Sequence, residues 1–310
     1  MTVADGSLVR LAYVAESAIG TIPTSPVFQI LRYENSDIRI SKQTDIPNEV
    51  DSTGNVQSIT DVGRSVTGSI SALLSYGTYD KFLESLLRKA WASNVLVNGT
   101  SAITLTIEEF DELGTTDAYI RYRGMRVNTL DLTMDARKSV QANFGFMGID
   151  SPTPTTAILS GATYTAVTTT EVFNAGLNLS GLAITGITNS PIMMKLSLKI
   201  NSNVYQNDAV GQYAPYGHGL GRAEVTGSFT AYFENLDTYQ AILDHTTVAL
   251  AWTLEDAAGN SYLFELPKVK LLDGGPAKPG NGQAVMIDVP FQAFKDSGIG
   301  GSIKITRTAV

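Results

Sequence analysis

Short runs in which apolar and polar residues alternate recur along most of the chain. Seven such runs begin at Ile38, Val66, Ile103, Leu196, Val225, Val248 and Val285. In each run one set of alternate positions is apolar and the other is more polar, which is typical of antiparallel strands with one buried face. The pattern therefore predicts a mainly β protein.

Two segments depart from this period of two. Apolar residues recur at spacings of three and four between Tyr79 and Ala90, which predicts an amphipathic helix of about three turns with Thr78 as its N-cap. Trp91 is expected at this helix and Trp252 in a strand, both as core residues. A second, shorter helix is expected after Asp237.

The strand and helix patterns recur as an internal repeat. Gly63-Arg64 returns as Gly221-Arg222, 158 positions later, and the strand 66–72 matches 225–231 at an offset of 159. A helix follows that strand in both copies, and Phe146 matches Phe291 in a later strand. Because the matches keep one order, they indicate two copies of one unit.

The repeat predicts the domain organisation. Residues 28–149 are expected to form the first unit and 186–310 the second unit with a C-terminal tail. Residues 1–27 are expected to be an N-terminal arm. Residues 150–185, which include a stretch rich in Thr, Pro and Ala, are expected to be a linker or extended arm.

Composition narrows the chemistry. The 310 residues are 43% hydrophobic, enough for a core, and they include no cysteine and two histidines, His218 and His245. Disulfides, thiolate metal sites and cysteine nucleophiles are therefore excluded, and most general-base and zinc chemistries lack their usual residues. The net charge of −8 does not favour nucleic-acid binding. We expect no targeting or membrane-inserting segment, because the uncharged stretch 172–194 is interrupted by polar residues and a proline.

Glycine-rich stretches do not support nucleotide binding. The run 217–221 opens a strand and not a helix, so a phosphate-binding loop is disfavoured and a flexible loop tip is expected. The run 274–280 lacks the ending of a P-loop and is interpreted as a turn. His218 is expected in the loop and His245 at a helix end. We expect no catalytic residues, no cofactor and no metal site.

Charged residues form two clusters. Glu108, Glu109, Asp111 and Glu112 lack calcium-loop spacing and are interpreted as a solvated hairpin tip, with ion or partner contact and paired catalytic carboxylates as alternatives. Arg121, Arg123 and Arg126 are expected to form salt bridges with the acidic excess rather than to bind nucleic acid.

Several motifs resemble those of the tail tube proteins, or major tail proteins, of long-tailed bacteriophages. They are Tyr13-x-x-Glu16-x-x-x-Gly20-Thr21-x-Pro23, the Val-Thr-Gly-Ser strand of each half, Ser75-Tyr76-Gly77-Thr78-Tyr79-Asp80 before the helix, Phe146-Met147-Gly148, and Ser151-Pro152-Thr153-Pro154-Thr155. The resemblance covers essentially the whole chain through the order and spacing of these motifs.

The resemblance implies a β-sandwich or half-barrel unit flanked by one helix. In related tubes six such units form a ring whose inner sheets join into a barrel of 24 strands, and rings stack around a tape-measure protein. With two units per chain, a trimer would give a pseudo-sixfold ring. The alternative is a hexamer with the second copy outside. Tail terminator and distal tail or baseplate proteins are further expected partners, in a virion protein assembled in the host cytoplasm.

Strand spacing sets the size of such a ring. Twenty-four strands about 4.8 Å apart and tilted near 45° give a backbone diameter of roughly 50 Å and a bore of roughly 40 Å. Duplex DNA, on the order of 20 Å across, would pass. An acidic wall would let DNA pass without binding, and the net charge of −8 is compatible with that.

The family's long loop between the first hairpin strands implies contacts between rings. By position this loop is 44–62, with its copy at 203–220. The candidate contact residues are Asn48, Glu49, Asp51, Asn55, Tyr205, Tyr213 and Tyr216. Two other classes of function remain open: a non-catalytic β-sandwich module that binds, for example, carbohydrate on a phage or cell surface, and an enzyme on a β scaffold.

Overall fold

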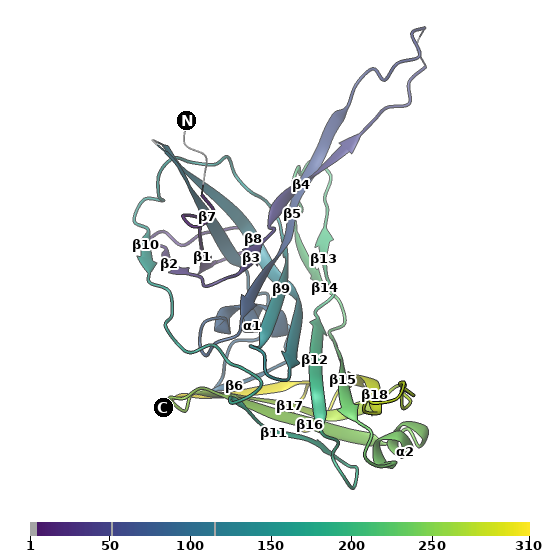
Figure 1. The fold of residues 1–310 in the computed structure, drawn as a ribbon. Helices are drawn as coiled ribbons and strands as arrows, with labels where there is room; N and C mark the ends of the chain where they lie inside the picture. Colours follow the sequence, from purple (N-terminus) through teal and green to yellow (C-terminus); the bar gives the residue numbers. More distant parts are fainter. Residues whose placement is uncertain (1–4, 51, 115) are drawn as a thin grey trace.

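In the described residues the architecture consists of a long sheet, two short sheets that share strands with it, a separate two-stranded sheet and two short helices. The computed structural model describes residues 5–50, 52–114 and 116–310, and Figure 1 shows the arrangement of its strands. The alternation of apolar and polar residues is thus realised as strands, and the mainly β prediction is confirmed.

The elements follow one another along the chain with short connections. The first half holds β1 (Arg10–Ala15), β2 (Val27–Ile30), β3 (Asn35–Ser36), β4 (Arg39–Asp45), β5 (Thr60–Leu73), α1 (Asp80–Leu87), β6 (Val95–Val97), β7 (Leu105–Leu113), β8 (Thr116–Asp135) and β9 (Gln141–Gly148). The second half holds β10 (Thr163–Thr165), β11 (Leu179–Thr185), β12 (Met193–Asn201), β13 (Val204–Asn207), β14 (Gly217–Leu220), β15 (Glu224–Tyr232), α2 (Asp237–Leu243), β16 (Thr247–Glu255), β17 (Ser261–Leu271), β18 (Met286–Ala293) and β19 (Lys304–Thr308).

Eight strands form one continuous antiparallel sheet, which we call the long sheet. Its order is β4-β5-β9-β8-β12-β15-β18-β17. The first four strands and the last four repeat one pairing order. Phe146 lies opposite Gly68 in the first four, and Phe291 lies opposite Gly227 in the last four. The residues that the sequence repeat matches therefore occupy matching positions in the two ladders.

The hairpin that opens each half differs in register from the sequence match. The repeat matches Ile40 with Leu198, yet Ile40 pairs with Val66 while Leu198 pairs with Gly227. The second pairing is shifted by two residues. A shift of two keeps each side chain on the same face of the sheet, so the alternation of apolar and polar positions does not detect it.

Two short sheets cover the long sheet. The first has the order β10-β2-β1-β7-β8 and the second the order β11-β16-β17-β19-β6. β8 and β17 are long enough to belong to a short sheet at one end and to the long sheet at the other. The core lies between these layers, where the buried side chains of both halves form one cluster.

The segments expected as arm and linker take part in these sheets. β1 lies within residues 1–27 and pairs with β2 and β7, and its Leu11 and Ala12 are buried. β10 and β11 lie within residues 150–185, and β11 pairs with β16.

The Glu16 carboxylate explains the opening motif of the chain. It accepts hydrogen bonds from the Thr106 hydroxyl at 2.7 Å and from the amides of Gly20 and Gly124 at 2.7 and 2.8 Å. One acidic side chain thus joins the turn after β1 to β7 and β8.

The first helix is shorter than the sequence predicts. α1 ends at Leu87 because Arg88 adopts a left-handed conformation with φ 59°, and Trp91 lies beyond the helix. The predicted N-cap was wrong: Tyr79 holds that position, and the Thr78 hydroxyl interacts instead with the hydroxyls of Ser75 and Thr168. Trp252 is a core residue as expected and stacks on Phe264 at 5.1 Å.

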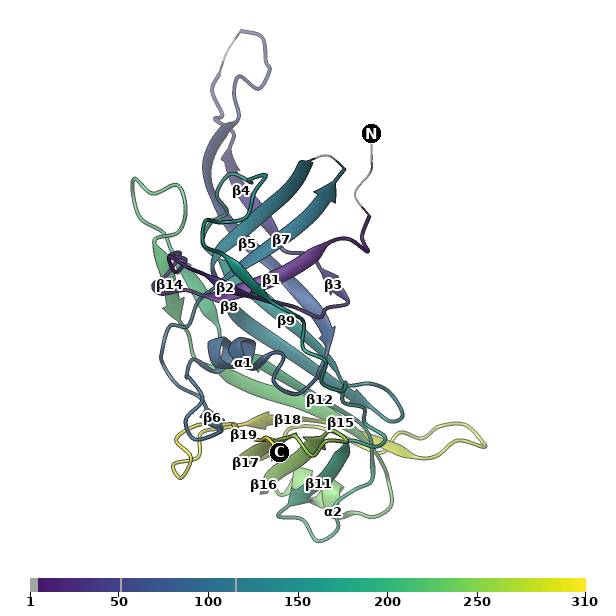
Figure 2. The same ribbon diagram turned by 90° about the vertical axis from the view of Figure 1, so that its left-hand side faces the viewer.

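α1 packs against β8 beneath the long sheet (Figure 2). Its Phe82 is 0% exposed, and the ring centroid lies 5.1 to 6.0 Å from those of four neighbouring aromatic rings. These rings belong to Tyr13, Tyr79, Phe144 and Phe146. Phe82 therefore connects the first short sheet, the helix and the long sheet.

Phe82→Ala should lower the free energy of unfolding by about 3–5 kcal/mol, because it leaves a cavity among four rings. Urea denaturation followed by circular dichroism measures the loss. Leu113→Ala, at a side chain that is 45% exposed, is the control and should change stability by less than about 0.5 kcal/mol. Equal losses in the two variants would contradict this account of the core.

Candidate assembly surfaces

The junction of β8 with β12 joins the two halves of the long sheet. Seven residue pairs run from Lys195 opposite Asp135 to Asn201 opposite Thr129. Ion pairs between Lys199 and Asp131 at 3.3 Å, and between Lys195 and Asp135 at 3.7 Å, cross the same junction. The main-chain ladder sets the register, and these exposed ion pairs add little stability.

Beyond β12 the chain stays attached to the first half. Asn128 accepts a hydrogen bond from the Ser202 amide through its main-chain oxygen at 2.8 Å, and one from the Val204 amide through its side chain at 2.8 Å. The buried Ser202 hydroxyl donates to the main-chain oxygen of Leu86 in α1. The Arg88 guanidinium donates to the main-chain oxygen of Gly221 at 2.9 Å. Sequence patterns do not indicate this role for Asn128, Ser202 and Arg88, because the partners of these residues lie 74 to 133 positions away.

One face of the long sheet is lined with small polar side chains. The apolar positions of its strands point into the core, and the alternate positions carry mainly hydroxyl and amide groups. They include Thr67, Ser69, Ser71, Asn143, Thr129, Thr133, Ser197, Thr226, Ser228, Thr230 and Gln292. We call this surface the polar face. At the junction its charges are paired, so that region is close to neutral and not acidic.

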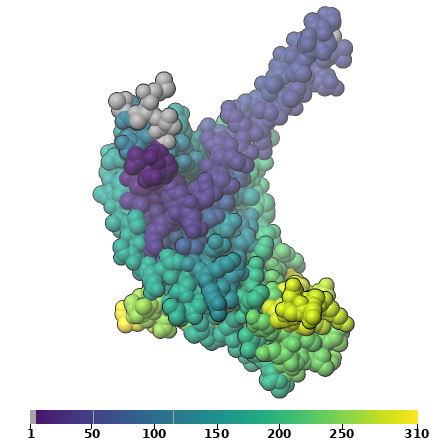
Figure 3. All heavy atoms as spheres, viewed as in Figure 1, coloured from purple at the N-terminus to yellow at the C-terminus, as the bar shows by residue number. Residues whose placement is uncertain are grey.

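Two hairpins project from one end of the long sheet. The first hairpin consists of β4, β5 and the loop 46–59, and it extends beyond the body of the molecule (Figures 1 and 3). The second hairpin consists of β13, β14 and the loop 208–216. They lie beside each other at the base of the first hairpin.

The second hairpin is docked on the first half of the chain. The amide of Arg64 donates to the main-chain oxygen of Tyr213 at 3.0 Å, and the Arg64 guanidinium lies 5.2 Å from the centroid of the Tyr213 ring. The Tyr213 hydroxyl donates to Asp61 at 2.6 Å, and the Gln206 side chain donates to the main-chain oxygen of Gly148 at 3.1 Å. Tyr213, a candidate for contacts between rings, thus already has partners within the chain.

The first hairpin has little covering it. All seven residues of β4 are exposed, and so are Asn48, Glu49 and Asn55 among the candidate contact residues. Asp51 lies outside the described residues. Ile46, Val50, Val56, Ile59 and Val62 are at least half exposed. Tyr205 and Tyr216 of the second hairpin are also exposed, Tyr216 at 77%.

The glycine-rich segment 217–221 is not the flexible tip that the sequence suggested. Residues 217–220 form β14, which pairs with β13 and packs toward Arg126 and the end of β9. Burial, and secondarily the nearby Arg126 charge, lowers the pKa of His218 to about 4. His218 is therefore neutral at pH 7. His245 follows α2 as expected.

The acidic cluster is a solvated hairpin tip only in part. Glu108 is 1% exposed and forms an ion pair with Arg121 at 2.8 Å, while Tyr164 donates a hydrogen bond to its other oxygen. It is buried because β10 and β1 bring Tyr164 and Arg10 over β7, which the local sequence does not reveal. Glu112, nearer the turn, is exposed as expected.

The arginine cluster divides in the same way. Arg121 and Arg123 form the expected salt bridges, with Glu108 and with Asp150 at 3.2 Å. Arg126 does not. It is 0% exposed, none of its guanidinium nitrogens has a hydrogen-bond partner among the described residues, and burial lowers its pKa to about 10. The expectation was wrong there because the second hairpin and Arg88, not an acidic residue, lie next to it.

Within residues 5–50, 52–114 and 116–310, no group of three or more potential metal ligands lies together. No helix in the same residues is long and apolar enough to cross a membrane. The outer side of β4 has no strand paired with it in the described chain. This open edge, the projecting first hairpin and the polar face are compatible with a β protein that pairs with further chains.

Comparison with known families agrees with this class. The family model for phage tail tube proteins matches residues 6–293, nearly the whole chain. The chain therefore belongs to the phage tail tube protein family, which makes it a structural component of a virion tail. No curated protein matches it.

The burial of His218 predicts a pH dependence of stability. The pKa of His218 is about 4 in the folded state and about 6.5 in the unfolded state, so the folded state favours the neutral imidazole. Stability is complete above pH 6.5 and is lost as the pH falls toward 4, by up to about 3 kcal/mol. His218→Gln should remove this part of the loss, measured by urea denaturation at pH 7 and pH 4.5. His245→Asn is the control and should keep the wild-type difference. A wild-type difference in His218→Gln would contradict the prediction.

Proposed function

We propose that this protein polymerises into stacked rings that form the phage tail tube, the conduit through which the genome enters the host. The observation that carries the proposal is the long sheet with two open ends. At one end the outer side of β4 has no strand paired with it in the described chain. At the other, β17 is already paired with β16, but residues 272–277 continue from it beside β18, bonded at Leu272 and Ala277, and their outer side has no strand paired with it in the described chain. Open edges of this kind recruit strands of other chains.

The proposed organisation is an internal duplication. The tube units are residues 28–149 and 186–310, with 1–27 as an arm and 150–185 as a connecting segment. The repeated pairing order and the matching positions of Phe146 and Phe291 support it. β1 and β11 contribute to the short sheets, so the arm and the connecting segment are also structural.

The proposed ring contains three chains. The β8–β12 junction joins the two halves of one chain, and it provides the template for the contact between chains. The free edge of β4 corresponds to the edge of β12 that pairs with β8, and residues 272–277 occupy the place along β18 that β8 occupies along β9. Three chains with eight strands each give the 24 strands of the ring. A hexamer with the second unit outside is less compatible, since both halves already share one sheet.

The polar face is the proposed wall of the lumen. The hydroxyl and amide groups of this face, together with the paired charges at the β8–β12 junction, offer phosphates no cluster of cations, so DNA can pass without specific binding. In this proposal DNA passes because the wall is uniformly hydrated and offers no binding site, and not because an acidic wall repels it. We assign the protein no catalytic activity, cofactor or metal. The tape-measure, terminator and baseplate proteins are the proposed partners of the assembled tube, which forms in the host cytoplasm.

The tip of the first hairpin is the proposed contact between rings. Asn48, Glu49 and Asn55 are exposed residues of the loop 46–59, and the hairpin extends past the body of the chain (Figure 3). Asp51, outside the described residues, is proposed with them from its place in the sequence. Tyr205 and Tyr216, exposed on the neighbouring hairpin, are proposed to add to the same contact.

The purified protein should form rings or tubes that negative-stain microscopy detects, and native mass spectrometry of single rings should give three copies. Six copies would favour the hexamer. A chain that stays monomeric at high concentration would contradict the proposed function.

Replacing residues 48–55 with a Gly-Asn turn should separate stacking from ring formation. The shortened hairpin keeps the edge of β4, so rings should form while long tubes do not, as judged by microscopy and sedimentation. A variant with Lys278→Ala, outside the hairpin, serves as the control and should form tubes. If the shortened variant still forms tubes of normal length, the tip does not join rings.

A further inference from the structure

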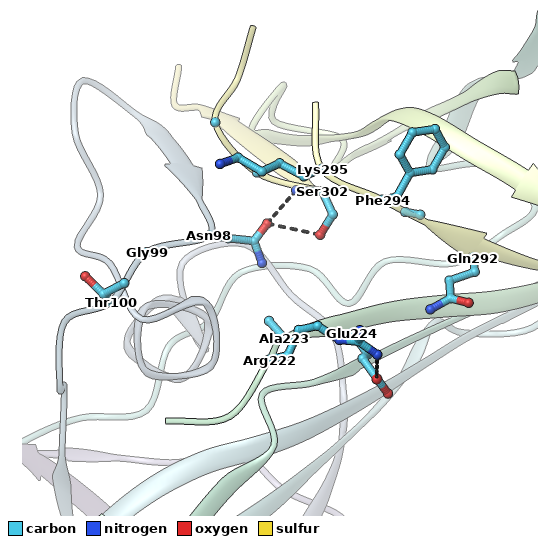
Figure 4. Close-up of a pocket in the computed structure, with 13 residues that line it drawn as sticks. Asn98, Gly99, Thr100, Arg222, Ala223, Glu224, Gln292, Phe294, Lys295 and Ser302 are labelled. Carbon is cyan, nitrogen blue, oxygen red and sulfur yellow. Dashed lines mark hydrogen bonds and ion pairs between the residues drawn. The ribbon is translucent and has the colours of Figure 1, made fainter. Parts of the chain in front are cut away.

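The second hairpin is docked on the first half of the chain, and no hairpin is docked at the equivalent place on the second half. A cleft of about 510 Å³ lies at that place (Figure 4). Its walls are the start of β15, the end of β18 and the loops around residues 98–100 and 300–302. Arg222 and Glu224 line one side, with 2.9 Å between them, and Phe294 and Lys295 line another. Phe294 is 39% exposed, although it is a large apolar side chain.

The equivalent place in the first half is filled. Because Phe146 and Phe291 hold the same position in their ladders, Gly148, Ile149 and Asp150 correspond to Ala293, Phe294 and Lys295. Gly63-Arg64 likewise corresponds to Gly221-Arg222. In the first half these residues receive the second hairpin: Arg64 bonds to Tyr213, and Gly148 bonds to Gln206. Tyr216 and Asp150 line one small cavity there.

The first hairpin is the segment equivalent to that occupant. Its base contacts the second hairpin at Asp61 and Arg64, while its loop extends beyond the body of the chain (Figure 1). It has 25 residues between Ile40 and Val66, while the second has 24 between Ile200 and Val225, so the two have nearly the same reach. The first points away from the body, so it does not reach the cleft of its own chain (Figure 1). It leaves Val56 and Ile59 about two-thirds exposed.

Charge and polarity match the two surfaces. Residues 45–59 contain Asp45, Glu49 and Asp51 and no lysine or arginine. The cleft presents Lys295 to these carboxylates, while its Arg222 is already paired with Glu224. Residues 56–59 carry no charge, and their Val56 and Ile59 match the apolar surface that the exposed Phe294 ring offers. Apolar side chains that are exposed in one chain and face a cleft with an exposed aromatic ring are typical of an interface between copies.

We propose that the cleft is the seat for the β5-side flank of the first hairpin, residues 56–59, of the neighbouring copy within the same ring. The proposal rests on the proposed function and deepens it: the hairpin flank closes the ring, while its tip reaches the next ring. Within a chain, the second hairpin docks on the first half. Between copies, the first hairpin would dock in the same way on the second half of the neighbouring chain. Ser58 of one copy corresponds to Tyr216 and lies near Lys295 of the next.

A pair of introduced cysteines tests this seat, because the chain has no cysteine of its own. Ser58→Cys with Lys295→Cys should form a disulfide between copies under mild oxidation, since a disulfide requires Cα atoms within about 7 Å. Both side chains are exposed, so the fold should tolerate the changes. Denaturing electrophoresis should show covalent dimers and trimers and no larger species, because a contact within a three-chain ring closes on itself.

The controls separate the possible results. Ser58→Cys with Ser160→Cys, at an exposed position before β10, should give no covalent trimer. A ladder that continues beyond the size of one ring would place residue 58 between rings and would overturn the seat. Tubes that form without any covalent product would also overturn it while leaving the proposed function intact. A wild-type chain that never assembles would overturn both.

Discussion

The main-chain ladder between β8 and β12 is the contact on which the arrangement depends. It converts two groups of four strands into one sheet with a single apolar face and a single polar face. Because both apolar faces then lie on the same side, the helices and the short sheets of the two halves share one core. The ladder also fixes which sheet edges remain open. Every internal edge of the long sheet is paired, so the proposed assembly would use the two ends.

The two hairpins show how one local pattern gives two different outcomes. The second lies against the first half because Asn128, Ser202 and Arg88 hold its base, and Tyr213 lies over Arg64. The first, of nearly equal length, has no such neighbour within the chain and stays extended. The difference follows from position along the sheet, because only the second hairpin has another half of the same chain beside it. A ring would remove this difference by giving every hairpin a neighbour.

The burial of charged and titratable groups in this protein does not follow from their neighbours in the sequence. The neighbours of Glu108 along the chain suggest a solvated turn, yet its partners are Arg121 across the hairpin and Tyr164, 56 positions away. Arg126 and the ring nitrogens of His218 become buried together because β14 folds over the end of β9. Whether a carboxylate or an imidazole is solvated depends on which distant segment covers it. The free-energy cost of removing its charged form from water arises only when that tertiary contact forms.

The sequence by itself determined the strands, the two helical segments, the order of the repeated elements and the membership of a structural family without catalytic motifs. These properties depend on local alternation and on spacing, which the chain carries in any conformation. Only the tertiary structure decided that β8 pairs with β12, that the expected arm and connecting segment supply β1 and β11, and that one hairpin lies on the other half while the other extends beyond the body. Strand pairing selects among edges of similar polarity, and a shift of two residues leaves the alternation unchanged. The partner of each edge is therefore set by the packing of the whole sheet and not by the strand alone.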